Sequence, residues 1–300
     1  MPILEFYEVS NPVHWNIFVP IYFFVLSLSA GVAIVLSFSE ILNIGGFQSV
    51  RKPGYSIGLL MIALAPIFLI LDLGQPLRFW YTLNPFNFQV SSPMSWGAVL
   101  LIVFGLLMVL INKNFIVEKV SRQPLKEVAF TSNRKSLIGN LLFVVGLLIA
   151  AYPGVELGIL VGKTFWNNEL LPIYFVSTTI LAGVAILGCI LPFVKQNQGN
   201  LLVYISNSMI VLILISICWI AFRSIIIIGS GGTGIDSLTL MWSNKVFLFG
   251  EVIVGLVIPL ILLIIGKTKS KPIILSIVSI LVLIGVFSMR YALIFTQLAM

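Results

Sequence analysis

The sequence predicts an all-α integral membrane protein with eight transmembrane helices. Of its 300 residues, 59% are hydrophobic and 9% are charged, whereas a soluble domain carries about 25% charged residues. The hydrophobic residues gather in runs of roughly 20, the length of helix that crosses a bilayer core. The composition excludes a soluble protein, and the net charge of +7 requires an explanation that fits a membrane protein.

The predicted helices follow one another with short connections, apart from residues 112–136. The N-terminal segment MPILEFYEVSNPVHW is acidic and has no basic region, so we expect a permanent first helix and not a cleaved signal peptide. The glycine-rich stretch 229–234 lacks the Gly-Lys-Ser/Thr of a phosphate loop, and we expect a flexible connection there. The eight runs lie near residues 15–38, 55–73, 94–111, 137–160, 171–193, 201–228, 246–265 and 272–295.

Lysine and arginine are distributed unequally between the two sets of connections. The connections after the first, third, fifth and seventh runs carry twelve of them, and the opposite side carries three. Because basic residues stay on the cytoplasmic side, we expect both termini to be extracytoplasmic, in a multi-pass protein of the cytoplasmic (inner) membrane. The twelve are Arg51, Lys52, Lys113, Lys119, Arg122, Lys126, Arg134, Lys135, Lys195, Lys267, Lys269 and Lys271, and the three are Arg78, Lys163 and Lys245.

The sequence contains an internal repeat. The residues Pro-Ile-Tyr-Phe at 20–23 and Ala-Gly-Val-Ala-Ile at 30–34 recur 152 positions later, at 172–175 and 182–186. A weaker similarity relates 146–152 to 285–291. Four helices per repeat give both halves the same orientation in the membrane, which is a parallel repeat. The sequence therefore predicts two four-helix bundles side by side, residues 1–165 and 166–300.

Charged residues interrupt the apolar runs or end them. Each costs roughly 2.5–3.5 kcal/mol at the centre of a membrane helix, so their presence needs a reason. On the predicted topology they all lie in the outer half of the membrane, and the inner half holds Glu40 and little else. The five residues are Asp72, Glu156, Arg223, Glu251 and Arg290.

Two interpretations of these charges are open. They can be buried ion pairs that hold the helices in register, or they can exchange protons in a pocket that opens outward. The one-sided distribution favours the second interpretation, with the four residues other than Arg223 as the proton-exchanging groups. Tyr152 lies four positions before Glu156, so the two side chains share a helix face.

His14 is the only histidine in the sequence. A b-type haem is usually held by two histidines, so we expect no haem, and the two cysteines, Cys189 and Cys218, form no CxxC pair that would bind metal. Asn11 and Pro12 read as a helix N-cap followed by proline at the first helical position. Asn11 and His14 are three residues apart and can contact one polar ligand together, although His14 can also be an interfacial residue.

Several segments now point to one family. They are ALAPIFLILDLGQPLRFW (63–80), SPMSWGA (92–98), AYPGVELG (151–158), the pattern of Glu251, Gly255 and Ile-Pro-Leu (258–260), and IGVFSMRYALIF (284–295). They resemble the NrfD/PsrC family, the membrane subunits of polysulfide reductase-type and formate-dependent nitrite reductase complexes. The resemblance covers nearly the whole sequence. It departs from the family at Pro153, which follows Tyr152, and in having fewer helices than the longer branches.

The resemblance implies a site for menaquinone, or another quinone, near the outer surface. The family holds the quinone with an Asn and a His near the first helix and a Tyr in the fourth, and Asn11, His14 and Tyr152 match that arrangement. It also implies that acidic groups near the site carry protons, for which the three intramembrane carboxylates are candidates. No haem or metal is implied within this protein.

The resemblance further implies partners on the extracytoplasmic side. They are an iron–sulfur subunit of the 4Fe-4S ferredoxin type and a catalytic subunit, often a molybdopterin enzyme, in an oxidoreductase complex of anaerobic respiration. The quinone-reactive step would lie in this protein and the terminal substrate on another subunit. Two alternatives remain: a secondary transporter built on a four-helix repeat, and a purely structural membrane anchor.

Overall fold

The computed structural model describes residues 15–72, 88–90, 92–121, 132–158, 170–194, 199–229, 232–266 and 271–298. Within these ranges the regular structure is helical throughout. In this described part of the chain, eight helical segments are long and apolar enough to cross a membrane, as the sequence predicted, and they are those of a multi-pass membrane protein. Asn11 and His14 lie outside the described residues.

The helices match the predicted runs, with one added helix and with two runs that each contain two helical segments. The seventh run is a π-helix, η4 (Val246–Val257), continued by α9 (Ile258–Ile264). The expectation of a flexible connection at 229–234 is wrong in part, because a helix that the sequence did not predict, α8 (Gly232–Ser243), begins there. A short turn, η3 (Leu191–Phe193), forms the end of the fifth run. The other helices are α1 (Phe18–Ile41), α2 (Gln48–Asp72), α4 (Pro93–Ser121), α5 (Ser132–Gly158), α6 (Leu171–Ile190), α7 (Gly199–Gly229) and α10 (Pro272–Leu298).

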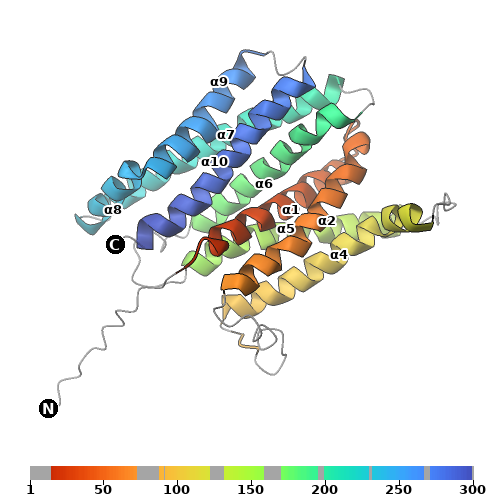
Figure 1. Ribbon diagram of the computed structural model, residues 1–300, viewed down its shortest axis with the longest axis horizontal. Coiled ribbons are helices and arrows are strands. Elements are labelled where there is room, and N and C mark those ends of the chain that lie inside the picture. The colour runs from red at the N-terminus through yellow and green to blue at the C-terminus, as the bar shows by residue number, and fades with distance from the viewer. Residues whose placement is uncertain are drawn as a thin grey trace.

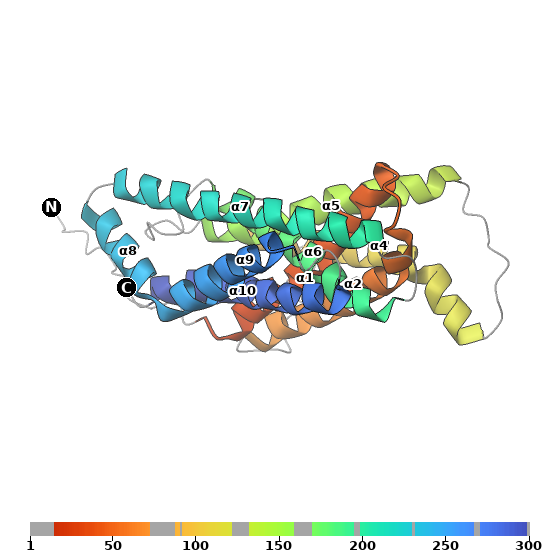
Figure 2. The ribbon, with the colours of Figure 1, turned by 90° about the horizontal axis from the view of Figure 1, so that it is seen from above.

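The long helices run along a common direction (Figure 1). On one side, α1 contacts α2 and α5, and α4 contacts α2 and α5. On the other side, α6 contacts α7 and α10, and η4 packs on α10. Seen from above, the end of α4 and the beginning of α5 project beyond the other helices (Figure 2).

Helices α1 and α6 form the centre, where the two sides meet. In the most apolar part of each span, 83% of the residues of α1 and 72% of those of α6 are buried, against 22–44% in the other described spans. Gly31 and Gly183 permit the close approach, because a Cβ at Gly31 would lie 2.7 Å from the Gly183 nitrogen. Small residues at a helix interface allow such backbone contact, which supplies packing energy where lipid provides no hydrophobic drive.

The five charged residues singled out from the sequence, Asp72, Glu156, Arg223, Glu251 and Arg290, gather at one end of the bundle. The Arg290 Nε donates to the Phe23 carbonyl near the start of α1, at 3.3 Å, and the Asn16 backbone N–H donates to Asp72 Oδ1, also at 3.3 Å. The starts of α1, α6 and η4 therefore lie with the ends of α2, α5, α7 and α10, as expected for neighbours of alternating direction.

The expectation that the opposite end holds Glu40 and little else is wrong. Glu40 forms an ion pair with Arg51, with 2.8 Å between Oε1 and Nε, and accepts a hydrogen bond from the Tyr55 hydroxyl at 3.2 Å. Nearby, the Asn112 amide donates to the Tyr55 carbonyl at 3.1 Å. These polar groups are common residue types at helix ends, so the sequence alone did not reveal that they converge.

Candidate functional site

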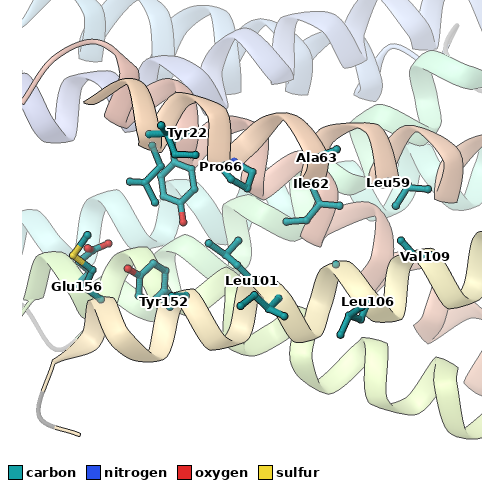
Figure 3. Close-up of a pocket in the computed structure, with 17 residues that line it drawn as sticks. Tyr22, Leu59, Ile62, Ala63, Pro66, Leu101, Leu106, Val109, Tyr152 and Glu156 are labelled. Carbon is teal, nitrogen blue, oxygen red and sulfur yellow. The ribbon is translucent and has the colours of Figure 1, made fainter. Parts of the chain in front are cut away.

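A pocket lies between α2 and α4, with a volume of about 480 Å³, within the range typical of ligand sites. The α4 residues that line it extend from Met94 to Val109, a length of about 22 Å at 1.5 Å per residue. Figure 3 shows its polar side chains at one end and aliphatic side chains along the rest. The lining residues are Tyr22, Leu59, Ile62, Ala63, Pro66, Leu69, Ile70, Met94, Gly97, Ala98, Leu101, Ile102, Gly105, Leu106, Val109, Tyr152 and Glu156.

The polar end of the pocket is formed by Tyr22 from α1 and by Tyr152 and Glu156 from α5. Helix α5 continues through Pro153 to Gly158, so Tyr152 and Glu156, four residues apart, stay on one face. The Tyr152 hydroxyl hydrogen-bonds to the Glu156 carboxyl. This places a proton donor and a carboxylate in line at the wall of an otherwise apolar pocket.

Gly97 creates the space that Tyr152 occupies. A Cβ added at Gly97 would overlap the Tyr152 ring and lie 2.6 Å from its hydroxyl oxygen. The glycine sits in the segment SPMSWGA, at the first turns of α4, where it faces the end of α5. The close approach of α4 to Tyr152 therefore fixes where the phenol points.

We expect Gly97→Ala to displace the Tyr152 ring, at a cost in unfolding free energy of about 1–3 kcal/mol from overpacking. Gly105→Ala is the matched control, because it lies on the same helix in the same pocket and its added Cβ would meet nothing within 4 Å. Thermal unfolding of the two variants in detergent measures the difference. Equal unfolding temperatures would contradict this account of Gly97.

A second polar cluster lies beside the first, around α6, η4 and α10. The Tyr174 hydroxyl donates to Glu251 Oε1, and Arg223 and Arg290 lie close enough for their charges to act on Glu251. Small cavities of about 10 Å³ adjoin Tyr174 and Arg223, which is close to the smallest volume that holds one water molecule. The cluster is thus packed, in contrast to the open pocket at Tyr152.

Arg290 is fully buried and bonded to its surroundings. Its Nη1 donates to the Val286 carbonyl at 3.0 Å and its Nη2 to Thr179 Oγ1 at 3.3 Å. Its guanidinium carbon lies 5.5 Å from the centroid of the Phe175 ring, a cation–π distance. Together with the bond to Phe23, these contacts make Arg290 a link between α10, α6 and α1.

The predicted site residues that the structure describes thus occupy three places. Tyr152 and Glu156 lie in the pocket, Glu251 and Arg290 lie in the packed cluster, and Asp72 contacts the backbone just before α1. Three residues that matter to these sites were not predicted: Tyr22, Tyr174 and Gly97. The first two were visible as the paired tyrosines of the repeat, but nothing in the sequence indicated which side chains they face.

Among the described residues, no group of three or more His, Cys, Asp or Glu side chains could hold a metal ion. The donor set of the pocket, two phenols and a carboxyl group, suits hydrogen bonding to an oxygen-bearing organic ligand. The remaining walls are apolar and suit a hydrocarbon tail. The residues present therefore fit a lipid-soluble ligand with a polar head.

Comparison with known proteins gives a consistent result. A polysulfide reductase protein of Wolinella succinogenes is 27% identical over 205 residues, which cover 64% of this chain and 63% of that protein, slightly under two thirds of its length. The NrfD homolog of Haemophilus influenzae is 25% identical over 301 residues, 92% of each protein. A selenate reductase subunit of Mesobacillus selenatarsenatis is 22% identical over 316 residues, 93% of this chain and 73% of that protein.

Two of these relatives bear the names of reductase components. The family described as "Polysulphide reductase, NrfD" matches residues 6–300, nearly the whole sequence. This match agrees with the motifs in the segments 63–80, 92–98 and 151–158, and it confirms the resemblance that they indicated. The chain therefore belongs to the NrfD family of membrane proteins.

Proposed function

We propose that this protein is the quinone-binding membrane subunit of a multi-subunit respiratory oxidoreductase of the polysulfide reductase type. The observation that carries the proposal is the pocket between α2 and α4, about 22 Å long, which is polar at one end and apolar along the rest. Menaquinone has this division into an oxygen-bearing ring and an isoprenoid tail. A purely structural anchor would have no need of such a pocket.

In this proposal Tyr152 and Glu156 bind the ring and accept a proton from it. A quinol releases two electrons and two protons when it is oxidised. Tyr152 Oη accepts a hydrogen bond from a ring hydroxyl and takes up its proton, while its own proton passes to the Glu156 carboxylate. The hydrogen bond between Tyr152 and Glu156 prepares this transfer, since general acid–base groups must lie within bonding reach.

Asn11 and His14 are proposed to contact the other ring oxygen. Both lie outside the described residues, but the first described residues lead to the same end of the bundle as Tyr152. Asp72 accepts a hydrogen bond from the backbone N–H of Asn16 and would position the segment that carries Asn11 and His14. A histidine side chain changes its protonation state near neutral pH, so His14 is suited to take the second proton.

Glu251 and Arg290 are proposed to exchange protons in the second half of the protein. Their cluster resembles the pocket in having a tyrosine bonded to a carboxylate. The contact between Gly31 and Gly183, at equivalent positions of the repeat, supports two parallel four-helix bundles, residues 1–165 and 166–300. The basic connections support extracytoplasmic termini, which would turn the polar end of the bundle outward.

The proposed partners follow from this orientation. Electrons would pass between menaquinol and a 4Fe-4S ferredoxin-type subunit at the outer surface, and from there to or from a molybdopterin or other catalytic subunit. The names of two relatives, one from a polysulfide reductase and one from a selenate reductase, support a role within a reductase complex. The protein would act in the cytoplasmic membrane, as one component of anaerobic respiration.

The proposal is tested by filling the pocket. Gly105→Phe places a ring in the apolar part of the pocket, where the present glycine has open space, and we expect it to weaken binding of 2-heptyl-4-hydroxyquinoline N-oxide, a quinone analogue, at least about tenfold. Fluorescence titration of the purified protein measures this affinity. Val103→Phe is the control, because Val103 is exposed on the same helix but does not line the pocket.

Two results would contradict the proposal. In one, the unmodified protein fails to bind the analogue, which leaves the anchor or the transporter as the better description. In the other, Gly105→Phe and Val103→Phe have the same affinity, which would place the quinone outside the pocket between α2 and α4.

A further inference from the structure

Tyr22 stands out among the residues of the pocket. Its side chain is 1% exposed, yet its hydroxyl has no hydrogen-bond partner among the residues that the structure describes. Burying a hydroxyl without a partner is unfavourable, and buried polar groups in native proteins are nearly always bonded. An unpartnered hydroxyl at the wall of a pocket therefore calls for a partner that enters the pocket.

The repeat supplies an internal comparison. Tyr174 is the equivalent residue, 152 positions later in the same Pro-Ile-Tyr-Phe sequence, near the start of α6 as Tyr22 is near the start of α1. Tyr174 is also buried, but its hydroxyl donates to Glu251. The same residue at the same position of the two halves is thus satisfied in the packed cluster and unsatisfied in the pocket.

The other polar groups of the pocket do not satisfy Tyr22. Glu156 accepts the hydrogen bond of Tyr152, and the remaining described lining residues carry apolar side chains or are glycine. Figure 3 shows Tyr22 reaching from α1 toward α5, with its hydroxyl on the side of the pocket where Tyr152 and Glu156 lie. Since the Tyr152 proton is directed at Glu156, Tyr22 is the hydroxyl in this group that can donate to a ligand.

We infer that Tyr22 is a ligand-binding residue whose hydroxyl donates a hydrogen bond to a carbonyl oxygen of the quinone ring. This inference rests on the proposed function and assigns different hydrogen-bonding roles to the two tyrosines. Tyr152, already donating to Glu156, accepts a bond from the hydroxyl of the reduced ring. Tyr22, with its proton free, donates to the carbonyl of the oxidised ring. The ligand class is a 1,4-quinone with a carbonyl oxygen near both phenols.

Binding of the oxidised headgroup tests this assignment. The full-length protein in detergent is titrated with 2-heptyl-4-hydroxyquinoline N-oxide, and 2,3-dimethyl-1,4-naphthoquinone is added as the competitor. We expect Tyr22→Phe to weaken naphthoquinone binding about 3- to 10-fold, the effect of one lost hydrogen bond. Tyr204→Phe, at an exposed tyrosine of α7, is expected to leave the affinity unchanged.

A second measurement does not depend on the quinone. In the ligand-free protein, Tyr22→Phe removes a hydroxyl that has no partner among the described residues, so the unfolding temperature should stay the same or rise. Tyr174→Phe removes the donor to Glu251 and should lower it. A fall for Tyr22→Phe as large as that for Tyr174→Phe would show that Tyr22 is bonded within the protein, and the inference would be wrong.

The inference and the proposed function can fail separately. If Tyr22→Phe binds the naphthoquinone as tightly as the unmodified protein, Tyr22 does not contact the ring. Weaker binding of the quinone analogue by Gly105→Phe would still support the quinone pocket in that case. If the unmodified protein binds neither probe, the proposed function fails and the inference with it.

Discussion

Replacing Arg290 by methionine is expected to lower the free energy of unfolding by about 3–5 kcal/mol, the usual effect of removing one member of a buried charge pair. Arg290 is fully buried, and its charge acts on the buried carboxylate of Glu251. Its bonds to the Phe23 carbonyl and to Thr179 would also be lost. Methionine fills much of the volume, so the effect would report charge and hydrogen bonding more than a cavity.

Denaturation of the detergent-solubilised protein measures this loss, with Arg51→Met as the control. Arg51 also pairs with a glutamate, at 2.8 Å, but its side chain is 38% exposed, so we expect a loss of less than about 1 kcal/mol. The double variant Arg290→Met/Glu251→Gln removes both charges and should recover part of the stability. Strictly additive losses would show that Arg290 and Glu251 are not coupled.

Glu156→Gln is expected to reduce quinol-dependent turnover of the assembled complex by about 100-fold or more, as for the loss of a general base. Glutamine keeps the size of the side chain and still accepts a hydrogen bond from Tyr152, but it cannot take up a proton. Binding of the quinone analogue should therefore change much less than turnover. Steady-state oxidation of a naphthoquinol, together with the analogue titration, separates the two effects.

Glu40→Gln makes the same chemical change at the opposite end of the bundle, where Glu40 contacts Arg51 and Tyr55. We expect its quinol oxidation to stay within about twofold of the unmodified complex, since nothing in the proposed proton transfer involves it. Full turnover of Glu156→Gln would remove Glu156 from the proton path. Similar losses in both variants would instead indicate that protons cross the whole bundle.

Much of the fold could be predicted because each span carries its own signal. A run of roughly 20 apolar residues is a membrane helix regardless of its neighbours, since lipid leaves the backbone no other partner for its hydrogen bonds. The pairing of Tyr152 with Glu156 was predictable for a similar reason, because spacing by four on one helix fixes their proximity. Helix α8 and the π-helical start of the seventh span had no such local signal.

The sequence by itself determined the number of spans and the family. It also identified the charged residues whose cost within a membrane indicates a role. Only the tertiary structure decided that these residues divide between an open pocket and a packed cluster, and that Tyr22 lacks, among the described residues, the kind of partner that Tyr174 has. The physical reason is that spacing along one helix is local, whereas a pocket depends on how closely different helices approach. That approach is set by contacts such as Gly97 with Tyr152 and Gly31 with Gly183.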